Sequence, residues 1–74
     1  MKRYDNLNGD SGVTAYEIRH DAVEVAFVNG SAYLYTDASA GADRIAEMRR
    51  LAEAGQGLSA YISQVQPGYE MRLR

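Results

Sequence analysis

The sequence predicts an α+β fold, in which a three-stranded antiparallel β-meander packs against one amphipathic helix and a second, shorter helix. Two patterns lead to this fold class. Residues 13–36 contain three segments in which apolar and polar residues alternate, which is typical of strands. Residues 42–65 instead repeat apolar residues at spacings of three and four, which is typical of helices. With 74 residues, the chain is long enough for a single domain with one thin core.

Three strands are expected in the first half of the chain. The first covers residues 13–19, and its alternation puts Val13 and Tyr16 on opposite faces. The second is the stripe of β-branched and aromatic residues within residues 22–27. The Asn29-Gly30 pair then indicates a turn, and the chain returns as a third strand up to residue 36.

The turn between the second and third strands allows two registers. A two-residue turn sets Tyr33 and Tyr35 on the face opposite the Val and Phe stripe. A three-residue loop that ends with Gly30 in the left-handed region instead pairs Val25 with Tyr33 and Val23 with Tyr35, which brings both tyrosines into the core. We favour the three-residue loop, because a chain with one Phe and six Tyr must bury some of its aromatic mass.

Two helices and a last strand are expected in the second half. Apolar spacing predicts an amphipathic helix over residues 42–54, with Ser39 as its N-terminal cap and Gly55 at its C-terminal end. A second, shorter helix follows and must stop before Pro67. Residues 69–74 alternate again, so a fourth short strand at the C-terminus is expected to pair with a sheet edge.

The chain is expected to divide into an arm and one domain. Residues 1–12 are rich in Asn, Asp and Gly, including Asn8 and Asp10, and are predicted to form a flexible N-terminal arm. Residues 13–74 form the domain. No apolar stretch approaches the roughly 18 residues that a membrane span needs, and the first residues lack the apolar region of a secretory signal. We therefore expect a cytoplasmic protein that does not contact membranes.

Charge and composition narrow the classes of partner. Eight Lys and Arg against ten Asp and Glu give a formal net charge of −2, the opposite of a general polyanion binder. The chain has no Cys, so neither disulfides nor thiolate-bound metals can reinforce the core. Its stability must then come from side-chain packing or from self-association.

Several segments together resemble a known family. They are Val23-Glu24-Val25-Ala26-Phe27, Asn29-Gly30, Tyr33-Leu34-Tyr35, a helix followed by Gly, and Tyr61-Ile62. This order is similar to the KTSC domain, named for the C-terminus of some lysyl-tRNA synthetases and also found as a free-standing bacterial protein. The resemblance covers about residues 13–66, and Tyr33 and Tyr35 match the central Tyr-x-Tyr of the family. It implies a domain of unassigned function for which RNA binding has been suggested.

One segment departs from the family pattern. After the long helix, a KTSC domain would carry Ser-Lys-Gly or a similar basic sequence, whereas this chain has Ala54-Gly55-Gln56-Gly57-Leu58. The missing Lys weakens the inference of RNA binding from the resemblance. If the turn has two residues, Glu24 and the Glu17 opposite it would share the face of Tyr33 and Tyr35, which adds a second reason, because two carboxylates beside a stacking surface repel phosphate.

The candidate contact residues combine aromatic and basic side chains. A nucleic-acid or partner surface is expected to use Tyr33, Tyr35, Arg49, Arg50, Arg72 and Arg74, if the chain ends fold beside the helix. A simpler reading of the helix arginines is a solvated face with ion pairs, because Arg50 lies three residues after Glu47 and Arg49 lies four before Glu53.

No catalytic, cofactor or metal site is expected. His20, the only histidine, lies beside Asp21 in a predicted turn, and no Ser has a nucleophile motif. A single histidine with scattered carboxylates also lacks metal-ligand spacing. We therefore expect a small non-enzymatic interaction module that binds protein or a second copy of itself, with a homodimer as the specific prediction. The alternative is a single-stranded RNA-binding domain that uses Tyr33, Tyr35 and nearby arginines.

Overall fold

The computed structural model describes residues 1–7, 9 and 11–74. Asn8 and Asp10, which belong to the predicted N-terminal arm, lie outside the described residues. In chain order, the elements are β1 (Lys2–Arg3), β2 (Val13–Ile18), β3 (Ala22–Phe27), β4 (Ala32–Thr36), α1 (Asp37–Ala40), α2 (Ala42–Ala54), α3 (Leu58–Val65) and β5 (Met71–Arg72).

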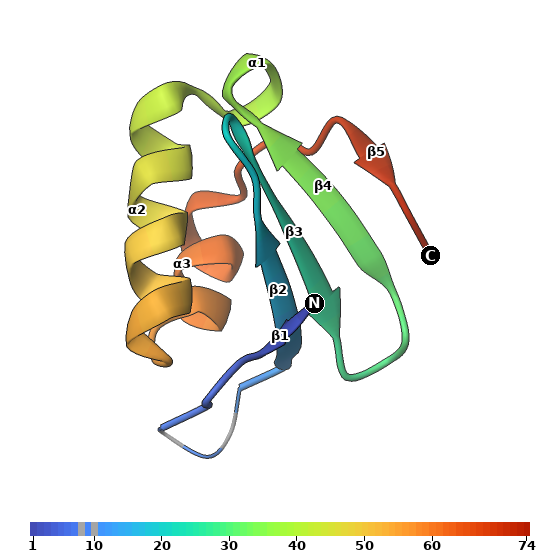
Figure 1. The fold of residues 1–74 in the computed structure, drawn as a ribbon, viewed down its shortest axis with the longest axis vertical. Coiled ribbons are helices and arrows are strands. Elements are labelled where there is room, and N and C mark those ends of the chain that lie inside the picture. Colours follow the sequence, from blue (N-terminus) through green and yellow to red (C-terminus); the bar gives the residue numbers. More distant parts are fainter. Residues whose placement is uncertain (8, 10) are drawn as a thin grey trace.

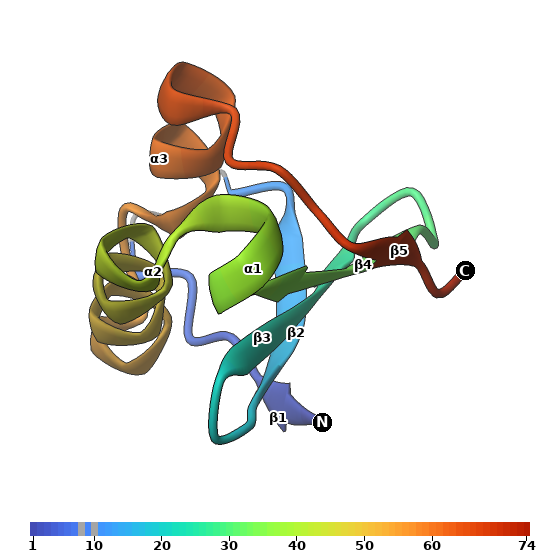
Figure 2. The ribbon, with the colours of Figure 1, turned by 90° about the horizontal axis from the view of Figure 1, so that it is seen from above.

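The strands form one antiparallel sheet in the order β1-β2-β3-β4-β5. Helices α2 and α3 cover one face of this sheet, and the other face carries no helix among the described residues (Figures 1 and 2). The predicted α+β class is therefore confirmed, as is the strand at the C-terminus. The predicted number of strands is wrong, because the described sheet has five and the additional one, β1, lies near the N-terminus.

Strand β1 extends the sheet beyond the predicted meander. Its two residues pair with β2, with Lys2 opposite Tyr16 and Arg3 opposite Ala15. Tyr4 follows directly and is 2% exposed. These residues lie within the predicted N-terminal arm, and the sequence pattern missed both the strand and the buried tyrosine. A two-residue strand is too short to show alternation, so it carries no signal of its own.

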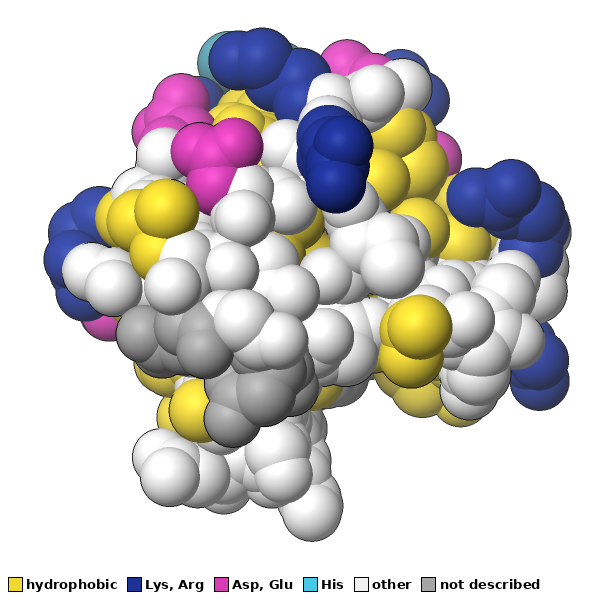
Figure 3. Space-filling view, turned by 90° about the horizontal axis from the view of Figure 1, so that it is seen from below, with side chains coloured by type: hydrophobic (Ala, Val, Ile, Leu, Met, Phe, Trp, Pro, Cys, Tyr) yellow, Lys and Arg dark blue, Asp and Glu magenta, His cyan; other side chains and the backbone are white. Residues whose placement is uncertain are grey.

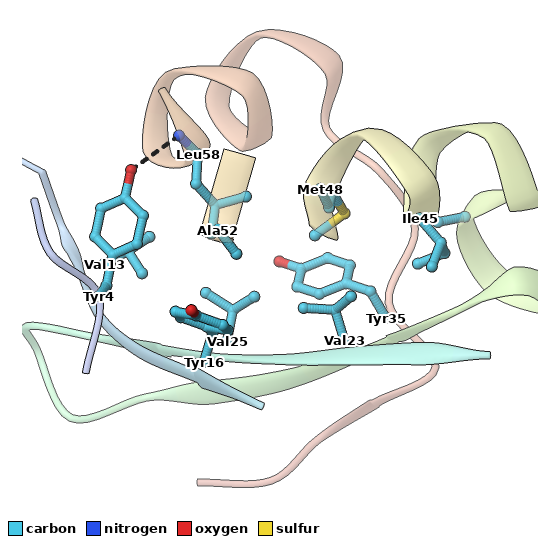
Figure 4. Close-up of a cluster of buried hydrophobic side chains, with 11 residues drawn as sticks. Tyr4, Val13, Tyr16, Val23, Val25, Tyr35, Ile45, Met48, Ala52 and Leu58 are labelled. Carbon is cyan, nitrogen blue, oxygen red and sulfur yellow. Dashed lines mark hydrogen bonds between the residues drawn. The ribbon is translucent and has the colours of Figure 1, made fainter. Parts of the chain in front are cut away.

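The buried Tyr4 joins the N-terminal segment to α3. The backbone N–H of Leu58 donates to the Tyr4 hydroxyl at 3.2 Å (Figure 4). This helix begins after Gly57, whose lack of a side chain leaves no side-chain cap. The hydroxyl therefore satisfies one of the N–H groups that a helix start leaves without an intrahelical partner.

Strand β2 contains a bulge that the sequence did not predict. Val13 lies opposite Phe27, but Ala15 lies opposite Ala26, so the register shifts at Thr14. The shift places both Val13 and Tyr16 in the core cluster on the helix-covered face (Figure 4). The prediction that they occupy opposite faces is therefore wrong. An extra residue in one strand reverses the alternation beyond it, and its position depends on the partner strand.

The β3–β4 connection confirms the three-residue loop. The N–H of Phe27 donates to the Ser31 carbonyl at 2.8 Å, and the N–H of Gly30 donates to the Phe27 carbonyl at 2.9 Å. Gly30 has φ +92°, in the region that favours glycine. The Asn29 side-chain oxygen accepts from both the N–H and the hydroxyl of Ser31. The alternative two-residue turn is wrong.

A short helix that was not predicted, α1, precedes the long helix α2. Thr36 and Ser39 form a reciprocal capping box around the short helix α1, in which each side chain accepts from the backbone N–H of the other. Ser39 therefore lies inside α1, and its predicted position as the cap of the long helix is wrong; Gly41 occupies that place. The bounds predicted for the long helix match α2, which ends at Gly55 with φ +74°.

Helices α2 and α3 supply the apolar layer that covers the sheet. Helix α2 buries Ile45, Met48 and Ala52. Helix α3 contributes Leu58 and ends before Pro67, as predicted. Figure 4 shows these side chains above residues of β2, β3 and β4. The buried cluster comprises Tyr4, Val13, Tyr16, Val23, Val25, Tyr35, Ala40, Ile45, Met48, Ala52 and Leu58.

We predict that Tyr4→Phe lowers the free energy of unfolding by about 1 to 2 kcal/mol, because it leaves the buried N–H of Leu58 without an acceptor while keeping the aromatic ring. Urea denaturation followed by circular dichroism measures the change. Tyr61→Phe is the matched control, since Tyr61 is half-buried and its hydroxyl makes no hydrogen bond among the described residues. Equal stability of the two variants would show that the Tyr4 hydroxyl does not stabilise α3.

Candidate interaction surface

The two tyrosines of β4 have different environments although they share one face. Tyr33 lies opposite Val25 and Tyr35 opposite Val23, so both point to the helix-covered side of the sheet. Tyr35 is 4% exposed and lies in the core beside Val23 and below Met48 (Figure 4). Tyr33 is only half-buried and packs at the margin of the core. Of the two, Tyr33 is therefore the residue that a partner can reach.

Tyr69, from the C-terminal segment, completes an aromatic cluster around Tyr33. The ring centroids of Tyr69 and Tyr33 are 4.7 Å apart, and Tyr69 meets Tyr35 edge-on at 6.4 Å. Phe27 approaches Tyr33 edge-on at 6.0 Å, and the Arg72 guanidinium carbon lies 5.8 Å from the centre of the Tyr33 ring. Such geometries are favourable for aromatic pairs and for cation–π contacts. The cluster therefore joins β3, β4 and the C-terminal segment.

Exposed apolar side chains also lie along β5 and in the adjoining β3–β4 loop. Among the described residues, four of the six exposed large apolar side chains belong to the β3–β4 loop or to the segment around β5, and Tyr69 and Met71 are 55% and 49% exposed. We call this region the β5 surface, and we define it by Val28, Tyr33, Tyr69, Met71, Arg72 and Leu73. The sequence did not single out Tyr69, Met71 or Leu73. Their alternation was the available signal, but it does not reveal which strand they pair with.

Two hollows among the described residues bear on possible binding. One of about 340 Å³ is mainly apolar and adjoins the β5 surface, where it is lined by Gly12, Phe27, Val28, Asn29, Ser31 and Tyr33. The other, of about 310 Å³, lies at the start of α3 and is lined by Tyr4, Asn6, Ser11, Gln56, Gly57, Ser59, Ala60 and Ser63. The described residues that line this second hollow include no histidine or carboxylate that could act as a general base for its serines.

The arginines of α2 are separated from those at the C-terminus. Arg50 makes two hydrogen bonds to Glu47, at 2.9 and 2.6 Å, which confirms the predicted ion pair. Hydrogen bonding to Arg50 lowers the pKa of Glu47. Helix α2 and strand β5 lie on opposite sides of the molecule in both ribbon views (Figures 1 and 2). The fold therefore does not bring Arg49 and Arg50 to the β5 surface.

The remaining basic residues are also dispersed. Lys2 and Arg3 belong to β1, which forms the edge of the sheet opposite β5. In the view from below, Lys and Arg side chains are spread around the outline of the molecule rather than gathered in one area (Figure 3). Only Arg72 and Arg74 lie in the segment that forms β5 and ends the chain. The single basic patch considered from the sequence is therefore not assembled.

The open face of the sheet, away from the helices, carries paired charges. Glu17 lies opposite Glu24, as predicted. Arg19 donates to the Glu24 carboxylate at 2.7 and 3.1 Å, and the Met1 amino group lies 3.5 Å from Glu17. Each carboxylate thus has a cation beside it, and exposed pairs of this kind contribute little to stability. This part of the face has no surplus of positive charge.

Among residues 1–7, 9 and 11–74, no three His, Asp or Glu side chains come together in a way that could hold a metal ion. None of the described helices is long and apolar enough to cross a membrane.

Comparison with protein-family models, with curated proteins and with solved structures finds no match to this chain. The resemblance to the KTSC domain therefore stays a prediction.

The burial of Tyr35 makes the stability of the protein depend on pH. Burial raises the pKa of Tyr35 above its ordinary value of 10.0, and the neighbouring Tyr33 and Tyr69 raise it further. The folded state thus favours the protonated phenol more than the unfolded chain does. This contribution to stability is fully present below about pH 10 and is lost as the pH rises through the higher pKa of the folded state.

We predict that the wild-type protein loses more free energy of unfolding between about pH 9 and about pH 11 than Tyr35→Phe does, because the phenylalanine cannot ionise. Urea denaturation at a series of pH values gives, for each protein, the slope of the free energy of unfolding against pH. Identical slopes would show that Tyr35 does not contribute to the alkaline loss of stability.

Proposed function

We propose that this protein is a small interaction module that associates with a second copy of itself through the β5 surface. The observation that carries the proposal is the concentration of exposed apolar side chains on and beside one edge strand. Scattered single apolar residues are normal on protein surfaces, whereas a group of them marks a contact site. Here the group includes Val28, Tyr69, Met71 and Leu73.

The position of these residues at a sheet edge supports association. Strand β5 is a terminal strand of the sheet, so its outer side presents backbone groups that another chain can pair with. A domain of this size buries only roughly 60% of its unfolded surface, so covering further apolar area in a dimer adds to a thin core. The net charge of −2 imposes little repulsion between two copies.

We expect sedimentation analysis to show a concentration-dependent increase from the 8.2 kDa monomer to a species of twice that mass. Met71→Glu should raise the dissociation constant of this dimer by at least about tenfold, because the contact loses apolar area and gains a charge. Leu7→Glu is the matched control: Leu7 is also exposed, but its backbone N–H donates to the Gly55 carbonyl at the end of α2, on the other side of the molecule from β5. It should leave the dissociation constant unchanged.

Two results would contradict the proposal. One is a strictly monomeric protein at every accessible concentration. The other is a dimer that Met71→Glu and Leu7→Glu weaken to the same extent, because this would place the contact elsewhere on the molecule.

Single-stranded RNA binding is a second candidate function, supported by Arg72 next to the Tyr33 ring. Aromatic rings beside a cation are the arrangement on which bases stack while their phosphates are neutralised. The resemblance to the KTSC domain points in the same direction. In this function, Tyr69 takes the place that the sequence assigned to Tyr35, because Tyr35 is buried and has no free face for a base.

For this second function, a labelled pool of single-stranded oligoribonucleotides should bind with an affinity that falls as salt is raised. Tyr69→Ala should weaken binding by about fivefold to a hundredfold, the loss expected for one stacked base. Arg72→Ala should also weaken it, whereas Arg50→Ala, on α2, is the matched control. Binding that is absent, or that responds equally to the two Arg variants, would exclude RNA binding at the β5 surface.

A further inference from the structure

The last residues of the chain form a segment that depends on β4 for its place. After α3, residues 66–70 lead to β5, and Figures 1 and 2 show this stretch crossing from the helices to the far edge of the sheet. Strand β5 pairs with β4 and with no other strand among the described residues. The segment therefore occupies the edge of β4 much as a bound peptide would.

Defined contacts hold this segment on the rest of the domain. The N–H of Glu70 donates to the Leu34 carbonyl at 2.7 Å, and the N–H of Leu73 donates to the Ala32 carbonyl at 2.7 Å. Farther along β4, Tyr69 packs on Tyr33. Near α1, the Ser39 hydroxyl donates to the Gly68 carbonyl at 2.8 Å, and the Thr36 hydroxyl donates to the Glu70 carboxylate at 3.1 Å. All of these partners lie in β4 or α1.

The junction between α3 and this segment is strained. Gln66 has φ +53° and ψ +57°, a left-handed conformation that is unfavourable for a residue with a side chain. It directly precedes Pro67, and a residue before proline prefers extended backbone. Because Gln66 is exposed, it can change conformation without disturbing the core. An extended Gln66 would direct residues 67–74 away from their own β4.

We infer that residues 67–74 exchange between two copies of the chain, so that β5 of each copy pairs with β4 of the other. This inference rests on the proposed self-association and specifies its mode. The exchanged segment re-forms the same contacts with the second copy, so none is lost. In return, both Gln66 residues leave the left-handed region. The aromatic cluster is then shared, because Tyr69 and Arg72 of one copy lie against Tyr33 of the other.

In such a dimer, the short junction also limits how far the two copies can separate. An extended residue spans at most about 3.6 Å, so exchange through a hinge at Gln66 keeps the folded domains of the two copies in contact. Met71 and Leu73 belong to the exchanged segment, so in the dimer they lie against β4 of the second copy. Exchange therefore uses the same strand on which the proposed function depends.

Engineered cysteines test the exchange directly, because the natural chain has none. Leu34 and Met71 are paired across β4 and β5. A Leu34→Cys variant and a Met71→Cys variant that carries a mass tag are unfolded together, refolded together and oxidised. Exchange predicts a disulfide between the two variants, detected as a mixed-mass species on a non-reducing gel and located by peptide mass spectrometry. Circular dichroism confirms that each variant folds.

The possible outcomes distinguish exchange of the segment from self-association without exchange. A disulfide that joins position 34 of one variant to position 71 of the other supports exchange. A dimer that instead gives only the product joined through Met71→Cys in both chains overturns exchange but retains self-association, because it indicates two β5 edges side by side. Failure to dimerise at any concentration overturns both.

The strained hinge provides a second, independent measurement. Gln66→Gly relieves the left-handed conformation of the closed monomer, so it should raise the dissociation constant of the dimer by about tenfold, with two hinges contributing per dimer. Gln64→Gly, two residues earlier within α3, is the matched control and should leave the constant unchanged, since α3 is the same in monomer and dimer. An unchanged constant in Gln66→Gly would overturn the role assigned to the hinge.

Discussion

The pairing of β3 with β4 is the constraint on which the rest of the structure depends. It is set by a three-residue loop in which Gly30 adopts φ +92°. This register places Tyr35 opposite Val23 on the helix-covered face, where it fills space between the sheet and α2. A shift of one residue would turn every β4 side chain to the other face. The loop geometry therefore decides which residues form the core and which remain for binding.

The two ends of the chain are held by hydrogen bonds to groups far away in the sequence. The Tyr4 hydroxyl accepts from the backbone of Leu58, 54 positions later, and so joins β1 to the start of α3. At the other end, Thr36 and Ser39 cap α1 and also bind the segment that leads to β5. Thr36 and Ser39 thus serve a local helix end and a distant segment at once. The described residues thus form a five-stranded sheet, although the middle of the chain alone predicts three strands.

The placement of the C-terminal segment beside β4 also creates the candidate surface. The Tyr-x-Tyr pair of β4 is divided between two roles, because Tyr35 is covered by α2 while Tyr33 lies at the margin of the helical layer. The C-terminal segment then adds Tyr69 and Arg72 beside Tyr33. The surface is therefore composite, and its chemistry depends on where the last residues of the chain are placed. The arginines of α2, on the other side of the molecule, do not take part.

The features that could be predicted from the sequence are those with a local physical cause. Apolar spacing and Gly55 define α2, and the Asn29-Gly30 turn with its flanking alternation defines β3 and β4. The candidate Tyr33 was found in the same way. Helix α1 escaped notice because four residues are too few to show a period.

The folded chain alone shows the bulge at Thr14, the strand β1 and the placement of Tyr69 against Tyr33. Each of these depends on a partner that is distant in the sequence. The free energy of such a pairing depends on both segments, so the sequence of either segment alone does not predict it.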